Sequence, residues 1–311
     1  MVRANISRAV YVPSAVSSFF EICDTNPDGS RVEDVLKIGS RGGGFVLKRG
    51  SITRASESAR GNSIRINSRE TTLARTTQRV IDLMRIKFGF GPVKISHTIE
   101  PPIGFGFGTS GSGALGAAIA LSDLFELDLS LSQLSAFAHT AEVESVTGLG
   151  TVISLASGAG SIGLVTEPGS FAVGRVDSIL VDLARYVMVC ACFGPIEKSS
   201  VLQDANRRQK VNEFGRDTLE VVMGDPTPSN LLSHSRLFAE RTGIASKELL
   251  ALSDWAVRQG AIGATQNMIG NSIHCLVERN QSKTFVKSLR QVMKGGSIFV
   301  SELVNSGPAF V

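Results

Sequence analysis

The chain has 311 residues, 42% of them hydrophobic and 19% charged, which is typical of a globular protein with an ample core. Its formal net charge is only +4, and no basic run is interleaved with aromatic residues, so we expect no nucleic-acid partner. The start of the chain has no apolar signal region, and no stretch reaches about 18 uninterrupted apolar residues. We therefore expect a cytoplasmic protein with no membrane association.

The four cysteines are scattered, and Cys190 and Cys192 lie inside an apolar segment. A Cys-x-Cys pair without a second pair is a poor zinc signature. We interpret all four as reduced thiols.

The first part of the chain is rich in predicted strands, and the last part in predicted helices. In chain order the patterns predict strands at 9–13, 44–48, 51–54, 63–66 and 93–99, with one helix at 71–87 among them. A glycine-rich loop, its helix and a second helix at 131–146 follow, and then strands at 161–166, 171–176 and 186–192. The remainder has predicted helices at 199–223, 230–241, 247–259 and 282–293, and strands at 272–277 and 297–300.

This order suggests two lobes of α+β character, which we place at 1–185 and 186–311. No internal repeat and no low-complexity linker separates them. A cleft between lobes is the usual place for a small-molecule site, so we expect the ligand there.

The glycine-rich loop, residues 102–114, is the most informative stretch. Its glycines permit positive φ and close approach of the backbone to an anion, and its hydroxyls can bond phosphate oxygens. An alanine-rich helix follows directly, with its apolar residues predicted on one face, and a helix N-terminus favours anions. The loop lacks the Gly-Lys-Ser/Thr ending of a Walker loop, and no clean strand leads into it as in a dinucleotide-binding fingerprint. Tight turns alone can also explain such glycines, so their spacing leaves phosphate binding open.

The full pattern Pro-x-x-x-Gly-Phe-Gly-Thr-Ser-Gly-Ser resembles the ATP loop of the GHMP kinases. Segments 11–22, 38–45, 138–152 and 263–272 resemble the archaeal pantoate kinase branch of that superfamily. The resemblance therefore covers nearly the whole chain. It implies an α+β, two-lobed GHMP kinase-like fold, with a ribosomal-protein-S5-like N-terminal lobe, an α/β C-terminal lobe and the active site between them.

The resemblance also implies an ATP-dependent kinase that uses Mg²⁺ and phosphorylates the hydroxyl of a small anionic substrate. The implied ATP-binding residues are Pro102, Gly104, Gly106, Gly108, Thr109, Ser110, Gly111, Ser112 and Gly113, with backbone N–H groups of Gly106, Gly108, Gly111 and Ser112 on the phosphates. Ser110 and Glu142 are expected to hold Mg²⁺. Because Glu144 is only two residues along the predicted helix, it cannot face the same ion. The implied acceptor-site residues are Ser17, Ser18, Ser40, Arg41, Gly148 and Gly150.

Two departures from the branch bear on the substrate. Ala15 replaces a common His, and Thr151 replaces the Asp that places a carboxylate beside the acceptor hydroxyl in several GHMP kinases. Thr cannot act as a base near neutral pH, but phosphoryl transfer can proceed by alignment and charge neutralisation. His139, on an alanine-rich helix, is interpreted as structural. Met268 and Asn271 are expected to pack beside the phosphate loop.

These departures, with a surplus of arginines, favour mevalonate 3-phosphate as substrate, which would make the protein a mevalonate 3-phosphate 5-kinase of the kind found in thermoacidophilic archaea. The arginines considered as extra donors are Arg41, Arg54, Arg60, Arg65, Arg69 and Arg75. Pantoate is the alternative substrate, and a non-catalytic GHMP-fold regulator is the alternative of another class. The sequence leaves a homodimer open.

Overall fold

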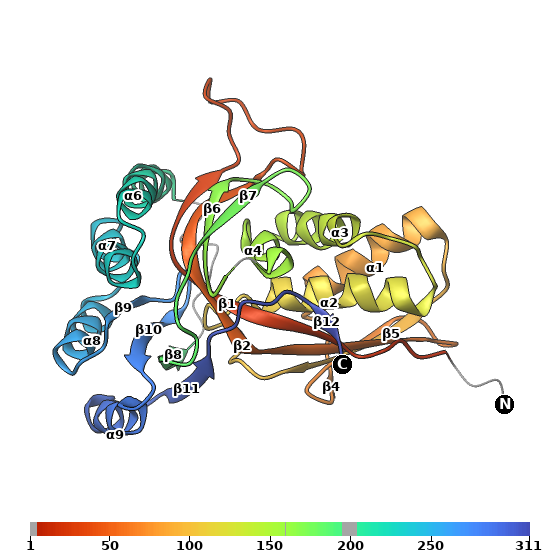
Figure 1. The fold of residues 1–311 in the computed structure, drawn as a ribbon. Coiled ribbons are helices and arrows are strands. Elements are labelled where there is room, and N and C mark those ends of the chain that lie inside the picture. The colour runs from red at the N-terminus through yellow and green to blue at the C-terminus, as the bar shows by residue number, and fades with distance from the viewer. Residues whose placement is uncertain (1–4, 159, 195–203) are drawn as a thin grey trace.

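The computed structural model describes residues 5–158, 160–194 and 204–311, and these form two lobes around a pair of long strands (Figure 1). The larger sheet has the strand order β12-β1-β2-β5-β3-β4, and β6 and β7 branch from β2. Its strands are β1 (Val10–Cys23), β2 (Gly39–Glu57), β3 (Ser63–Ile66), β4 (Arg69–Glu70), β5 (Val93–Ile99), β6 (Ile162–Glu167), β7 (Arg175–Ile179) and β12 (Ala309–Phe310). β1 and β2 pair antiparallel along nearly their whole length.

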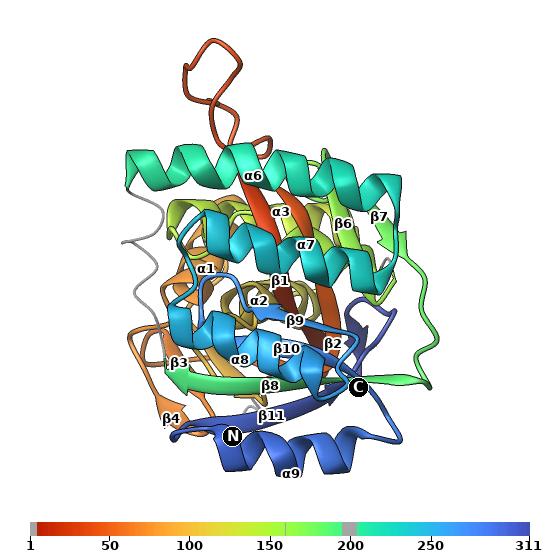
Figure 2. The ribbon, with the colours of Figure 1, turned by 90° about the vertical axis from the view of Figure 1, so that its left-hand side faces the viewer.

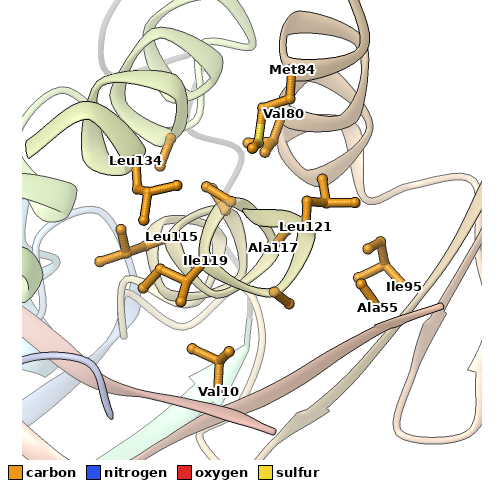
Figure 3. Packing of buried hydrophobic residues seen from close by; sticks show 14 of the residues in the cluster. Val10, Ala55, Val80, Met84, Ile95, Leu115, Ala117, Ile119, Leu121 and Leu134 are labelled. Atoms are coloured by element: carbon orange, nitrogen blue, oxygen red, sulfur yellow. The ribbon is translucent and has the colours of Figure 1, made fainter. Parts of the chain in front are cut away.

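Helices cover one face of this sheet, with α2 in the middle (Figures 1 and 3). They are α1 (Arg75–Phe88), α2 (Thr109–Leu124), α3 (Leu131–Glu144) and α4 (Thr151–Ser157). The α2 side chains Leu115, Ile119 and Leu121 lie between the sheet and the neighbouring helices, and nearly every residue of α2 is buried. The expectation of a one-sided apolar face on this helix is therefore wrong. An alanine-rich helix can be enclosed all round because its small side chains let neighbours approach closely.

The C-terminal lobe has a four-stranded sheet in the order β11-β8-β10-β9, and all its neighbours pair antiparallel. Its strands are β8 (Tyr186–Gly194), β9 (Gly263–Gln266), β10 (Asn271–Glu278) and β11 (Ser297–Glu302), and its helices are α6 (Ala205–Gly224), α7 (Pro228–Arg241), α8 (Lys247–Arg258) and α9 (Ser282–Val292). Figure 2 shows these helices side by side in one layer. This lobe is therefore of the α+β type, whereas the resemblance implied an α/β lobe. Among the described residues no helix is both long and apolar enough to cross a bilayer.

One hydrophobic core is shared between the lobes. Phe19 and Phe45 of the long strands belong to the same buried cluster as Met188 of β8 and Phe238 of α7. The last strand, β12, also returns from the C-terminal lobe to pair with β1. The division at 185/186, just before β8, thus marks a change of sheet, and it stays our proposal for the domain boundary.

Several predicted elements differ from the structure in their bounds. The strand predicted at 9–13 continues to Cys23 as β1, and those predicted at 44–48 and 51–54 are one strand, β2. The helix predicted at 71–87 begins only at Arg75, and Leu73 is 82% exposed instead of lying on its buried face. The strand predicted at 171–176 is found at Arg175–Ile179. The helix predicted at 199–223 is seen from Ala205, and residues 199–203 lie outside the described part of the chain.

Candidate active site

The glycine-rich loop has the backbone conformation that its sequence predicts. Gly104, Gly106 and Gly108 have φ of 89°, 81° and 62°, a region that favours glycine. Gly108 is the N-cap of α2, and no side chain of the described residues caps this helix end. The N–H groups of Thr109, Ser110 and Gly111 therefore have no acceptor within the helix, and together with the helix dipole they form an anion site.

Ser112 lies one step too far along α2 to act as predicted. Its N–H donates to the carbonyl oxygen of Gly108 at 3.0 Å, and its hydroxyl bonds the carbonyl oxygen of Thr109 at 3.3 Å. Gly113 follows it inside the helix, and both residues are buried. The expectation that the Ser112 N–H binds phosphate is therefore wrong, because that N–H already closes the first turn.

The segment 263–272 supports the loop from behind. The Asn267 side-chain amide and the Ser272 hydroxyl both donate to the carbonyl oxygen of Phe105, at 3.2 and 2.6 Å. A Cβ at Gly106 would lie only 2.8 Å from Asn267 Cβ, so glycine is needed there for space as well as for φ. The Met268 N–H also bonds the carbonyl oxygen of Ser17. Packing beside the phosphate loop is thus confirmed for this segment.

Ser110 and Glu142 form the polar centre of the site. The Ser110 hydroxyl donates to Glu142 Oε1 at 3.0 Å, and Glu142 is only 2% exposed. The chain turns at Val146, with φ of 54°, and returns so closely over the carboxylate that a Cβ at Gly148 would lie 2.7 Å from Glu142 Oε1. Glu144 points elsewhere and pairs with Arg79, as its helical offset predicts.

This pair fits Mg²⁺ bound together with a nucleotide. Hydroxyl and carboxylate oxygens are ligands that Mg²⁺ accepts, and it commonly takes one or two protein ligands with phosphate and water. The described residues contain no group of three His, Cys, Asp or Glu side chains that could hold a metal by themselves. Ser110 and Glu142 therefore match a cation whose remaining ligands come from the nucleotide.

A pocket runs from the phosphate loop to the predicted acceptor residues. Its lining includes Gly106, Gly108, Ser110, Ser17, Ser40, Arg41, Gly148, Gly150 and Thr151. Phe19, Phe20, Val46, Met268 and Ile269 add apolar surface. Elements from both lobes thus meet here, and the transferred group and its acceptor can share one cavity.

Ser18 does not belong to this pocket, and its assignment to the acceptor site is wrong on geometry. The β1–β2 register shifts between Ser17 and Phe19, so Ser18 is the extra residue of a β-bulge and turns into the shared core. There its hydroxyl lies 2.8 Å from His274 Nε2, and His274 Nδ1 lies 2.8 Å from Asn267 Oδ1. Through His274, Ser18 therefore links β1 to Asn267 in the segment behind the phosphate loop.

No His, Asp or Glu is among the described residues that line the pocket. Thr151 begins α4, and its methyl group lies against Gly108 and Gly111, where a Cβ would come within 2.6 and 3.2 Å of it. His139 lies apart, with Nε2 3.1 Å from the carbonyl oxygen of Val35, and burial lowers its pKa. A structural role for His139 is therefore supported, and within the described part of the chain no residue of the lining replaces the missing Asp as a base.

Arg41 lines the pocket, but the other arginines considered for the substrate do not. Arg54, Arg60, Arg65, Arg69 and Arg75 are all exposed and absent from the lining. Four of them lie on strands or loops at the β3–β5 side of the sheet, and Arg75 begins α1. The expected surplus of positive charge at the acceptor site is therefore wrong.

Two further contributors were missed in the sequence. Glu21 is 4% exposed and bonds Arg41 from behind, and Arg216 bonds Glu21 from α6. An acidic residue inside the otherwise apolar stretch Phe19–Ile22 is a signal that could have revealed Glu21, because a buried carboxylate requires a partner. Nothing local in the sequence indicates Arg216.

Comparison with known proteins agrees with this site. A model of the GHMP kinases N terminal domain matches residues 75–158, which include the loop, Ser110 and Glu142. A pantoate kinase of Thermococcus kodakarensis is 30% identical over 81% of this chain and 83% of its own. The chain belongs to the GHMP kinase family. As a member it is an ATP-dependent phosphotransferase that acts on a hydroxyl group.

Other members extend the similarity over nearly the full length. A pantoate kinase of Methanocaldococcus jannaschii is 29% identical over 87% of this chain and 93% of its own. A solved structure described as a phosphotransferase related to the CoA biosynthesis pathway superposes with a TM-score of 0.84, at 25% identity over 98% of both chains. These matches place this GHMP kinase beside the archaeal pantoate kinases and confirm the two-lobed α+β fold.

Proposed function

We propose that this GHMP kinase transfers the terminal phosphoryl group of ATP to a hydroxyl of pantoate. The observation that carries the proposal is the pocket itself, in which the only ionisable side chain among the described lining residues is Arg41, surrounded by apolar surface. One guanidinium fits one carboxylate, and Phe19, Phe20 and Val46 fit a branched hydrocarbon. The similarity to enzymes named pantoate kinase supports the same acceptor.

Each part of the site has a definite task in this proposal. The N–H groups at the start of α2 bind the phosphates, and Arg41 orients the acceptor through its carboxylate. Ser110 and Glu142 would hold Mg²⁺, which supplies charge neutralisation on the transferred phosphoryl group. The transition state of such transfers is loose, so alignment and electrostatics can suffice without a general base.

Mevalonate 3-phosphate remains the second candidate because of two residues. Ala15 and Thr151 line the pocket where the pantoate kinase branch commonly has His and Asp. That acceptor carries a phosphate in addition to a carboxylate, and the phosphate alone has about −1.5 to −2 charges at pH 7. With Arg54, Arg60 and their neighbours away from the site, the described lining offers this second group no cation of its own.

Incubation of the purified protein with MgATP and each acceptor separately tests the proposal. The acceptors are pantoate, mevalonate 3-phosphate, mevalonate and 5-phosphomevalonate, and the readouts are ADP release and product mass. We expect pantoate to be the only one of the four acceptors that gives ADP release, together with a product that carries one phosphate. A bisphosphate from mevalonate 3-phosphate alone would replace pantoate by the second candidate, and no acceptor-dependent ADP release at all would favour a ligand-binding regulator.

Thr151→Val is expected to leave kcat within about threefold of the wild type. Valine keeps the methyl group that packs on Gly108 and Gly111 and replaces the hydroxyl, which cannot serve as a base near pH 7, with a second methyl group. Steady-state kinetics with the accepted substrate measure the effect. A loss of a hundredfold or more, the range of general acid–base catalysis, would show that the hydroxyl takes part in proton transfer.

A further inference from the structure

A buried carboxylate lies directly behind the acceptor pocket. Glu21 has a side chain that is 5% exposed, and each of its two oxygens is held by a different guanidinium. Oε2 accepts a hydrogen bond from Arg41 Nε at 2.8 Å, whereas Oε1 accepts from Arg216 Nε and Nη2 at 3.3 and 3.0 Å. The Arg41–Glu21–Arg216 cluster thus links the pocket to the surface of α6.

The cluster exists because α6 lies directly on the end of β1. A Cβ at Gly215 would come within 2.3 Å of the carbonyl oxygen of Phe20, so only glycine permits this approach. On the same side, the Ile22 N–H donates to Asn212 Oδ1 at 2.9 Å. Arg216, the residue after Gly215, therefore reaches Glu21 although it is 195 positions away in the sequence.

The charges of the cluster sum to a single positive charge, because one carboxylate offsets one of two guanidinium groups. Cys23 beside it stays neutral, since burial and the charge of Glu21 raise the pKa of its thiol. Arg41 uses Nε and Nη2 on Glu21, which leaves Nη1 for an acceptor. Charges only a few ångströms apart in a poorly hydrated site interact strongly. The negative charge of Glu21 must therefore weaken the attraction between Arg41 and an anion in the pocket.

We propose that Glu21 sets the charge class of the acceptor. By offsetting one of the two guanidinium charges, it makes the pocket suited to an acceptor with one carboxylate and unsuited to one with a second anionic group. Glu21 acts through Arg41 and is therefore a positioning residue. This inference rests on the proposed function in one respect, namely that Arg41 binds the acceptor carboxylate.

Two small carboxylates with the same carbon skeleton test the proposal. 3,3-Dimethylbutyrate carries one carboxylate, and 2,2-dimethylsuccinate carries a second in place of a methyl group. Neither has a hydroxyl to phosphorylate, so both can be titrated by ligand-observed NMR into enzyme with MgATP. The measured quantity is the Kd of the dicarboxylate divided by that of the monocarboxylate.

Glu21→Gln is expected to lower this ratio at least tenfold, because the charge of Arg41 in the pocket is then no longer offset and Arg216 adds a second positive charge behind it. Arg216→Gln is expected to raise it at least threefold, because the net charge falls to zero; its side chain is 64% exposed and Glu21 keeps its hydrogen bond to Arg41, so we expect the variant to fold. Asp24→Asn is the matched control. Asp24 pairs with Arg208 of the same helix at 2.7 Å, and neither residue lines the pocket, so the ratio should stay within twofold.

A ratio within twofold of the wild type in either folded variant, Glu21→Gln or Arg216→Gln, would overturn the proposal. Failure of both carboxylates to bind the wild type would overturn it as well, since Arg41 would then hold no carboxylate. The Kd ratio does not depend on turnover. If pantoate is not phosphorylated while the ratio shifts as expected, the proposed substrate is wrong and the charge-setting role of Glu21 stands.

Discussion

Glutamine at position 142 is expected to lower kcat by about 10²–10³-fold, the loss seen when one electrostatic stabiliser of a transition state is removed. Glu142 is buried and receives the Ser110 hydroxyl, and a glutamine oxygen can still accept that hydrogen bond. The variant should therefore fold normally while losing the charge that a nucleotide-bound cation requires. Steady-state kinetics at saturating ATP and acceptor, repeated over a range of Mg²⁺ concentrations, give kcat and the Mg²⁺ requirement.

Glu144→Gln is the matched control for this prediction. It makes the same chemical change two residues along the same helix, at an exposed carboxylate that pairs with Arg79 away from the pocket. We expect its kcat within about twofold of the wild type, as is usual for a weak surface ion pair. If Glu142→Gln and Glu144→Gln behaved alike, the assignment of Glu142 to the cation would be wrong.

Elements with a clear local pattern were predicted well from the sequence. The strand at Val93–Ile99 alternates strictly between buried and exposed residues, and its predicted bounds are confirmed. The helix predicted at 131–146 begins as expected at Leu131, because Ser130 and Gln133 form a capping box that fixes the N-terminus of the helix. Such signals lie within a few residues of each other, so no knowledge of the partner elements is needed.

The long strand β2 shows why other elements could not be predicted. The sequence suggested two short strands at 44–48 and 51–54, because glycines interrupt the pattern before and between them. In the structure a Cβ at Gly44 would lie 2.1 Å from the carbonyl oxygen of Val16, and one at Gly50 equally close to that of Val12. These glycines mark a close approach between β1 and β2, and such an approach is known only once the two strands are paired.

The residues of the site also divide into those that the sequence could predict and those that it could not. The phosphate loop and the Ser110–Glu142 pair could be predicted because each lies in a contiguous motif. Ser18 was misplaced because the strand was predicted to end at residue 13, so the alternation that turns Ser18 away from Ser17 was not applied to it. The Arg41–Glu21–Arg216 cluster was missed because its members come from three separate elements, whose meeting depends on how the lobes pack.

Acidification from pH 7 to pH 5 is expected to lower the free energy of unfolding by about 2 kcal/mol for each of two buried histidines. Burial lowers the pKa of His274 to about 3 and that of His97 to about 4. In the unfolded chain both titrate near 6.5, so between pH 6.5 and their folded pKa values the unfolded state binds more protons. The stability is therefore fully present above pH 6.5 and is lost as the pH falls.

The surroundings of these two histidines favour the neutral imidazole. His97 lies between the hydroxyls of Thr53 and Thr77, at 2.8 and 3.1 Å, and His274 lies between Ser18 and Asn267. All of these partners are neutral. Protonation would thus leave a buried charge without a counterion, which is far more costly than a buried hydrogen-bonded imidazole.

Two variants of the Ser18–His274 pair separate the titration from the hydrogen bond. His274→Gln removes the titrating group, so its free energy of unfolding should fall by about 2 kcal/mol less than that of the wild type between pH 7 and pH 5. Ser18→Ala removes only the hydrogen-bond partner and should cost about 1–3 kcal/mol at both pH values. Urea unfolding at the two pH values measures both effects. If the two variants lost stability in parallel on acidification, the buried neutral imidazole of His274 would not be the acid-sensitive group, and the pH dependence would have to come from other residues.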